Sequence, residues 1–156
     1  MPLFALFPTY TFDPTHNLWL KLSCLNHKVS SSDSAQIDAA IKLWMAQSGG
    51  KVAGKKVEVI IKDDAGVADT TRRLAQELVV NDKVVALAGF GLTPLALATA
   101  PVATQSKTPM VVMAAATSAI TEASPYIVRT SFTVPQVVTI LADWAIKNDI
   151  RKVVTL

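Results

Sequence analysis

Two adjacent carboxylates, Asp63 and Asp64, directly follow an apolar run at residues 57–61 that predicts a β-strand. Paired acids at the exit of a strand can bind Mg²⁺. A magnesium site of this kind needs a further acid after the next strand, where residues 89–91 are Gly-Phe-Gly. We therefore predict that the two carboxylates instead accept backbone N–H groups in the turn that follows the strand.

Residues 89–94, with the sequence Gly-Phe-Gly-Leu-Thr-Pro, begin like the glycine-rich turn that binds a dinucleotide. Pro94 occupies the third glycine position, and Ala114 stands where an acid for the ribose is needed. We therefore expect no nicotinamide cofactor, and no other cofactor is indicated. Thr93 predicts a helix N-cap with Pro94 as the first helical residue, and the free N–H groups of such a helix start can bind a carboxylate. A capped helix without a ligand explains the same residues.

A third turn, at residues 114–118, combines three alanines with Thr117 and a serine. Small side chains let a ligand approach the backbone closely, and Thr117 adds a hydroxyl with a neighbouring N–H. A capped turn between a strand and a helix explains the same residues, and the turn alone does not decide between the two interpretations.

The remaining reactive residues form no recognisable catalytic or metal site. Cys24, His27 and His16 are metal-ligand types, but they lack a second ligand pair at zinc-finger spacing, so we expect no metal. The chain has no Gly-x-Ser-x-Gly sequence, and its single thiol has no cationic setting that would activate it. We find no catalytic set and predict that the protein is not an enzyme.

Helices and strands alternate along the part of the chain that would position these turns. Apolar residues at helical spacing predict helices over residues 36–48, 70–80, 95–104 and 134–147. Short apolar runs predict strands over residues 57–61, 84–88, 110–113, 126–130 and 151–156. Residues 17–25 fit a short helix or a strand, and the pattern does not decide between them. The alternation predicts an open, doubly wound α/β fold, with a parallel sheet covered by helices on both faces.

Capping residues and prolines set the expected ends and bends of these helices. Asp69 predicts the N-cap of the second helix, and Pro101 favours a bend in the third because it lacks an N–H. Thr133 and Gln136 have the spacing of a capping box at the start of the fourth. We expect the apolar residues of that fourth helix to face the core, namely Val137, Ile140, Leu141, Trp144 and Ala145.

Length and composition fit one domain. The chain has 156 residues, of which 51% are hydrophobic, and this supplies a real core. Its net charge is only +3 and its Lys and Arg residues are scattered, so we expect no nucleic-acid partner. A single cysteine excludes an internal disulfide. No apolar run reaches the roughly 18 residues of a membrane span, and residues 1–8 lack the basic start of a recognisable secretion signal.

Several segments, taken in order, resemble the type I periplasmic binding proteins, and among them the leucine/isoleucine/valine receptors of ABC importers. They are residues 36–41, 54–59, 63–66 with Asp69, 88–89 with Thr93, 110–113 with 115–117, and 126–130. The resemblance covers residue 36 to the C-terminus. It implies a sheet of flavodoxin-like order and a periplasmic receptor that delivers a branched-chain amino acid, or a related small carboxylate, to the membrane subunits of an importer.

The resemblance also implies roles for three residues of a cleft between two lobes that close by a hinge. Thr93 stands at the hydroxyl position that binds the ligand carboxylate. Ala115 matches the residue whose carbonyl accepts the ligand ammonium, and Thr117 matches the one whose N–H and hydroxyl bind the carboxylate. No cofactor is implied.

The two ends of the chain depart from the family pattern. We expect an atypical N-terminal segment at 1–35, a first lobe at 36–150 and the start of a second lobe at 151–156, with the rest absent. Nothing in residues 1–35 matches the family's first strand, so we expect this strand to be atypical or missing. A truncated or misread coding sequence would explain both ends and would leave half of the ligand cleft.

Two other classes of protein fit the predicted elements. One is a stand-alone α/β ligand-sensing or regulatory module, such as the sensing half of a transcriptional regulator. The other is a small flavodoxin-like enzyme, which would require a bound cofactor.

Overall fold

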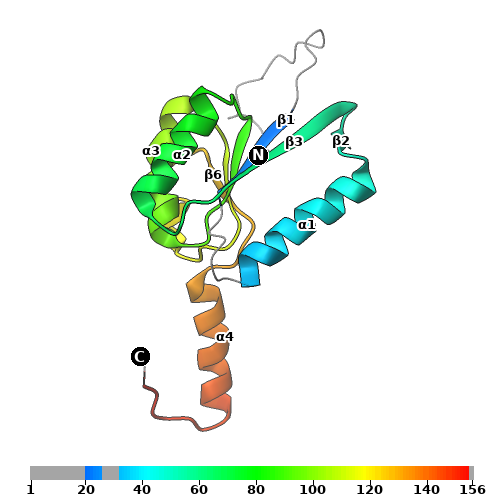
Figure 1. Cartoon of the computed structure of the whole chain (residues 1–156). Helices are drawn as coiled ribbons and strands as arrows, with labels where there is room; N and C mark the ends of the chain where they lie inside the picture. Colours follow the sequence, from blue (N-terminus) through cyan, green and yellow to red (C-terminus); the bar gives the residue numbers. More distant parts are fainter. Residues whose placement is uncertain (1–19, 26–31, 155–156) are drawn as a thin grey trace, which may run out of the picture.

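The structure is a computed structural model that describes the backbone of residues 20–25 and 32–154 and the side chains of residues 36–154 (Figure 1). The strands are β1 (Leu20–Leu25), β2 (Lys51–Val52), β3 (Lys55–Lys62), β4 (Ala86–Gly89), β5 (Met110–Val112) and β6 (Ile127–Arg129). The helices are α1 (Ser32–Ser48), α2 (Ala68–Val80), α3 (Thr93–Ser106) and α4 (Val134–Lys147), with a short 3-10 helix, η1 (Ser118–Ile120).

The strands form one sheet in the order β2-β3-β1-β4-β5-β6. Neighbouring strands pair in parallel, except β2 and β3, which form an antiparallel hairpin. The chain adds β3 on one side of β1 and then adds β4, β5 and β6 on the other side. This order confirms the open, doubly wound α/β fold. In such sheets a ligand binds outside the carboxyl ends of the strands, where the strand order reverses.

The main core lies between the sheet and the two helices α2 and α3. Figure 1 shows these helices side by side on one face, with α1 on the other side. Large side chains that are almost completely buried include Leu78, Leu87, Phe90, Met110, Val112 and Ile120. The face under α1 is packed less closely, because Ile37, Ile41 and Met45 are only partly buried. Among the described helices, none is long and apolar enough to cross a membrane.

Strand β1 lies at the centre of the sheet, between β3 and β4. Of the two alternatives expected for the first strand, atypical or missing, the structure therefore supports an atypical strand. Its sequence, Leu-Lys-Leu-Ser-Cys-Leu, alternates apolar and polar residues, whereas central parallel strands are usually apolar throughout. The strand has only six residues and its alternation ends at Cys24-Leu25, so residues 17–25 show no sustained period that decides between helix and strand.

Two predicted helix starts are shifted in the structure. Helix α2 begins at Ala68 after the N-cap Val67, so Asp69 lies in the first turn and is not the N-cap. Helix α3 begins at Thr93 itself after the N-cap Leu92, so the prediction of Thr93 as N-cap is also wrong. Thr93 retains a position in the first turn, where exposed N–H groups and the helix dipole favour an anion.

The fourth helix differs most from the expectation. Its start agrees with the predicted capping box, since Gln136 Oε1 accepts the N–H of Thr133 at 2.7 Å. Its apolar residues do not face the core, because α4 extends away from the sheet (Figure 1) and contains no buried residue. Residues 151–154 form no strand. A parallel strand needs a neighbour for its hydrogen bonds, and α4 carries these residues away from the sheet.

Candidate ligand-binding site

The two turns with predicted ligand-binding residues meet at the carboxyl ends of β4 and β5. Thr93 is the first residue of α3, and Thr117 precedes η1. Their hydroxyl oxygens lie 2.7 Å apart and share a hydrogen bond. The structure therefore brings these two predicted site residues together.

Backbone hydrogen bonds join the two turns directly below the threonines. The N–H of Met113 donates to Gly89 O at 2.8 Å, and the N–H of Ala115 donates to Phe90 O at 3.0 Å. Phe90 is fully buried and has a φ of 65°, a conformation that a non-glycine residue adopts only at some cost. Such strain persists where packing enforces it, and it concentrates at ligand sites.

The two threonines keep hydrogen-bond donors for a ligand. One hydroxyl hydrogen is used between them, which leaves the other hydroxyl hydrogen free to point outward. In the described part of the chain, the backbone N–H groups of Thr93 and Thr117 donate to no protein acceptor. Two unused N–H groups and a hydroxyl from these neighbouring residues are donors of the kind that a carboxylate accepts.

Ala115, the third predicted site residue, is turned toward the interior. It is only 3% exposed, and its carbonyl accepts Arg129 Nη1 at 2.7 Å and Ser131 Oγ at 3.2 Å. A carbonyl oxygen has two lone pairs, so these donors occupy both acceptor directions. Its predicted role as an ammonium acceptor stays a prediction.

Arg129, at the end of β6, is a site residue that sequence reasoning missed. Its guanidinium donates to the carbonyls of Ala115, Thr117 and Phe132, so it ties the segment after β5 to the segment after β6. The available signal was an arginine directly after the apolar pair Ile-Val of an expected strand. A partly buried cation in that setting needs acceptors close by.

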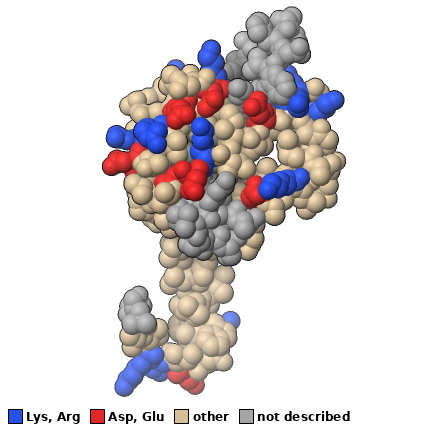
Figure 2. All heavy atoms as spheres, viewed as in Figure 1, with Lys and Arg blue, Asp and Glu red and all other residues tan. Residues whose placement is uncertain are grey.

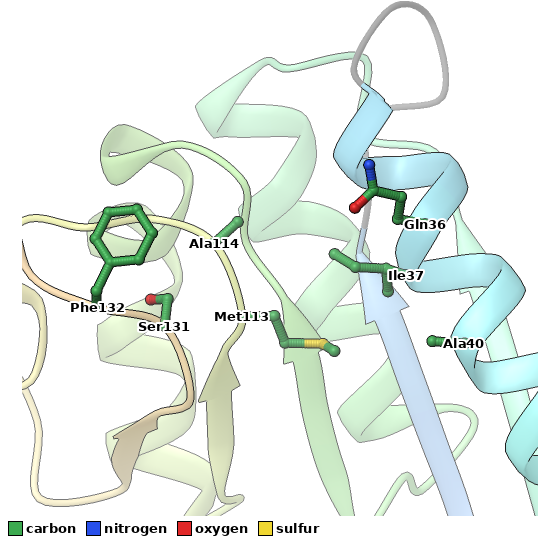
Figure 3. A pocket seen from close by; sticks show the side chains of 7 residues that line it. All are labelled: Gln36, Ile37, Ala40, Met113, Ala114, Ser131 and Phe132. Atoms are coloured by element: carbon green, nitrogen blue, oxygen red, sulfur yellow. The ribbon is translucent and has the colours of Figure 1, made fainter.

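A cavity of about 480 Å³ opens beside these segments (Figure 3). Figure 3 shows Gln36, Ile37 and Ala40 of α1 on one side, and the segments that follow β5 and β6 on the other. The latter contribute Met113, Ala114, Ser131 and Phe132. Most of these side chains are apolar, so the cavity suits a hydrocarbon group better than a charged one.

The two adjacent acids have the structural role that the sequence predicts. Asp63 Oδ1 accepts the N–H of Ala65 at 2.9 Å, and Asp64 Oδ1 accepts that of Gly66 at 2.9 Å. Asp64 is fully buried, and its second oxygen accepts the hydroxyl of Thr71 at 3.2 Å. Both carboxylates therefore hold the turn between β3 and α2.

The structure describes only part of the group of metal-ligand residue types that the sequence analysis considered. His16 and His27 lie outside the described residues, and Cys24 is described by its backbone position in β1. Within the residues that the structure describes, no three His, Cys, Asp or Glu side chains are close enough to hold a metal ion.

The surface carries mixed charge over the sheet and its helices. Figure 2 shows Lys and Arg side chains interspersed with Asp and Glu on this face, with no large area of one sign. Several charges pair locally, including Lys62 with Glu77 at 3.2 Å and Lys42 with Asp38 at 2.6 Å. The extended region of α4 is almost entirely uncharged in the same view.

Comparisons with known proteins show which family the chain belongs to. Residues 29–156 match the family model described as periplasmic binding protein. The Leu/Ile/Val-binding protein homolog 6 of Brucella abortus is 47% identical over 120 residues, which cover 76% of this chain and 30% of that protein. The homologues from Brucella suis and Brucella melitensis give the same values.

Solved structures show the same fold. A solute-binding protein from Rhodopseudomonas palustris BisB5, in complex with 3,4-dihydroxybenzoic acid, is 57% identical with a TM-score of 0.82, covering 85% of this chain and 37% of that one. Another, from strain HaA2 in complex with p-hydroxybenzoic acid, is 42% identical with a TM-score of 0.77, covering 83% and 36%. This chain therefore spans only 30% to 37% of the length of these relatives. It belongs to the periplasmic binding protein family and is related to the solute-binding proteins of ABC transporters.

Proposed function

We propose that this chain supplies the first-lobe half of the ligand site of an ABC-importer solute-binding protein. The observation that supports this most directly is the pair of hydroxyls, Thr93 and Thr117, 2.7 Å apart at the carboxyl ends of neighbouring strands. With the N–H groups of the same residues, they offer several donors to one carboxylate. On this proposal, residues 36–150 together with the central strand β1 make up the first lobe, and residues 151–156 begin the second.

The ligand would be a small carboxylate, and two classes are supported. The name of the Brucella relatives points to branched-chain amino acids. The structures that are 57% and 42% identical hold hydroxylated benzoic acids. We favour an aromatic acid, because the carbonyl of Ala115 already accepts Arg129 and Ser131 and such a ligand has no ammonium group to place there.

On this proposal, the solute-binding protein to which the lobe belongs works in the periplasm and delivers its ligand to the membrane subunits of an importer. Its role would be capture and release without chemical change, so we propose that it is not an enzyme. Ala115 would contribute mainly by its small size, which lets a ligand approach the backbone of the turn.

The test is titration of the purified chain with 4-hydroxybenzoate, 3,4-dihydroxybenzoate and leucine. Half of a cleft binds weakly, so calorimetry is combined with ligand-observed NMR, which detects weaker binding. We expect the aromatic acids to bind more tightly than leucine. Thr93→Val and Thr117→Val should each weaken binding about tenfold, as for one hydrogen bond to a charged group.

Thr139→Val is the matched control, since this exposed threonine of α4 bonds only to the carbonyl of Pro135. It should leave the affinity unchanged. Equal affinity in the wild type and both site variants would refute a carboxylate site at the two threonines. Tighter binding of leucine than of either aromatic acid would instead assign the site to amino acids.

A further inference from the structure

Arg129 contacts the backbone of Thr117, one of the two threonines of the site, and the proposed function gives it no role. It is half-buried at the end of β6. Nη1 donates to the carbonyl of Ala115 at 2.7 Å and to that of Phe132 at 3.4 Å, and Nη2 donates to the carbonyl of Thr117. One planar group thus reaches two carbonyls of the same turn and one beyond it.

The turn at residues 115–117 depends on these bonds because it has little regular structure of its own. The N–H of Ala115 is held by Phe90, and the carbonyl of Ala116 accepts the N–H of Val134 at 2.9 Å. The carbonyls on either side, of Ala115 and Thr117, both face the guanidinium. Arginine can hold two such acceptors because its donors form a rigid fork, whereas lysine carries a single charged nitrogen.

Within the part of the chain whose side chains the structure describes, Arg129 has no acid that would neutralise its charge. Among the described residues, no carboxylate lies within ion-pair distance of it. Its acceptors are neutral carbonyls, so a net positive charge remains beside the carbonyl of Thr117. A partly buried cation with neutral partners favours an anion at a nearby site.

We propose that Arg129 is a positioning residue for the ligand site. It fixes the turn so that the hydroxyl of Thr117 meets that of Thr93, and its charge favours an acidic ligand beside them. This inference rests on the proposed carboxylate site and names a residue that determines its shape. Arg129 does not itself touch the ligand on this view, because its donors are directed to the carbonyls.

The test uses Arg129→Lys, which keeps the charge and loses the fork, and Arg129→Gln, which loses the charge. Arg151→Lys and Arg151→Gln are the matched controls, because they make the same changes at an exposed arginine beyond α4 that pairs with Asp149 at 2.8 Å. The first measurement, made without ligand, is the nuclear Overhauser contact between the methyl groups of Thr93 and Thr117. The second is the affinity for 4-hydroxybenzoate, with the thermal midpoint recorded for each variant.

We expect both Arg129 variants to lose the methyl contact and to bind about tenfold more weakly, as for lost charge-assisted hydrogen bonds. The two Arg151 variants should keep the contact and bind within about twofold of the wild type, because Arg151 bonds only to the exposed Asp149. An Arg129→Lys protein that keeps both the contact and the affinity would overturn the proposal. If Arg129→Gln does not fold, Arg129→Lys and its control decide alone.

The two proposals fail in different ways. A wild-type chain that binds none of the acids refutes the carboxylate site but leaves the methyl contact as a test of Arg129. A wild type that binds, together with Arg129 variants that keep the contact and the affinity, refutes the role of Arg129 only.

Discussion

Thr93 and Thr117 lie 24 positions apart in the chain, yet their hydroxyl oxygens are 2.7 Å apart. The register of β4 and β5 explains this, because Gly89 pairs with Val112 and the chain leaves both strands at the same edge. Each threonine follows its strand by a similar number of residues. The paired strands therefore set the distance between the two side chains, and the residue types decide only what they can bind.

Asp64 illustrates a buried side chain whose hydrogen bonds hold a turn. Asp64→Ala should lower the free energy of unfolding by about 1–3 kcal/mol, because it leaves the N–H of Gly66 without its acceptor and the hydroxyl of Thr71 with the carbonyl of Val67 alone. The measurement is urea unfolding followed by circular dichroism.

Asp69→Ala is the control for this prediction. The Asp69 side chain is 93% exposed and its pair with Arg72 is long, at 3.8 Å, so we expect a loss below about 1 kcal/mol. Equal losses for the two variants would show that burial of Asp64 does not matter for the stability of the turn.

At the scale of helices and strands, most of the fold was predictable from the sequence. Strands β3 to β6 and helices α2 and α3 lie within about two residues of the predicted ranges. Their signals are local, namely apolar runs and helical spacing. Strand β1 could not be assigned from the sequence because it is short. Its central place in the sheet depends on pairing with β3 and β4, which are distant in the sequence.

The site was predictable only in part, for a similar reason. The positions of Thr93 and Thr117 in strand-exit turns followed from the predicted elements. The contacts of Arg129 with the carbonyls of Ala115 and Thr117 depend on how β6 lies against β5. Residue types near Arg129 give no direct sign of that pairing.

Helix α3 offers a prediction at the scale of one element, because Pro101 lies inside it. Pro101 is exposed and cannot donate a hydrogen bond to the preceding turn. Pro101→Ala should raise the free energy of unfolding by about 1–3 kcal/mol, since alanine restores this bond and has the higher helix propensity. Thermal unfolding by calorimetry measures the change.

Pro94→Ala is the matched control, because Pro94 lies in the first turn of the same helix, where no N–H is needed. We expect a change within about 0.5 kcal/mol. A destabilised Pro101→Ala protein would contradict this prediction and would mean that the proline itself favours the packing of α3.

At the scale of the whole molecule, α4 stands apart from the core that the other elements build. Ile140 is 72% exposed, Leu141 59% and Trp144 55%, although all three are strongly apolar. A surface of this kind is rare on soluble monomers and favours self-association. The apolar pattern was correctly recognised as a helix, but the sequence could not indicate that the helix would lie away from the sheet.

The exposure of α4 gives a prediction that separates it from the folded core. Leu141→Lys should change the free energy of unfolding by less than about 0.5 kcal/mol, because no buried contact is lost. It should also shift the protein toward the monomer in light scattering, since a charge interrupts the apolar surface.

The control is Leu78→Ala in the fully buried core, which should lower the free energy of unfolding by about 2–5 kcal/mol. A large loss of stability in Leu141→Lys would contradict this prediction and would show that α4 packs against the chain in solution.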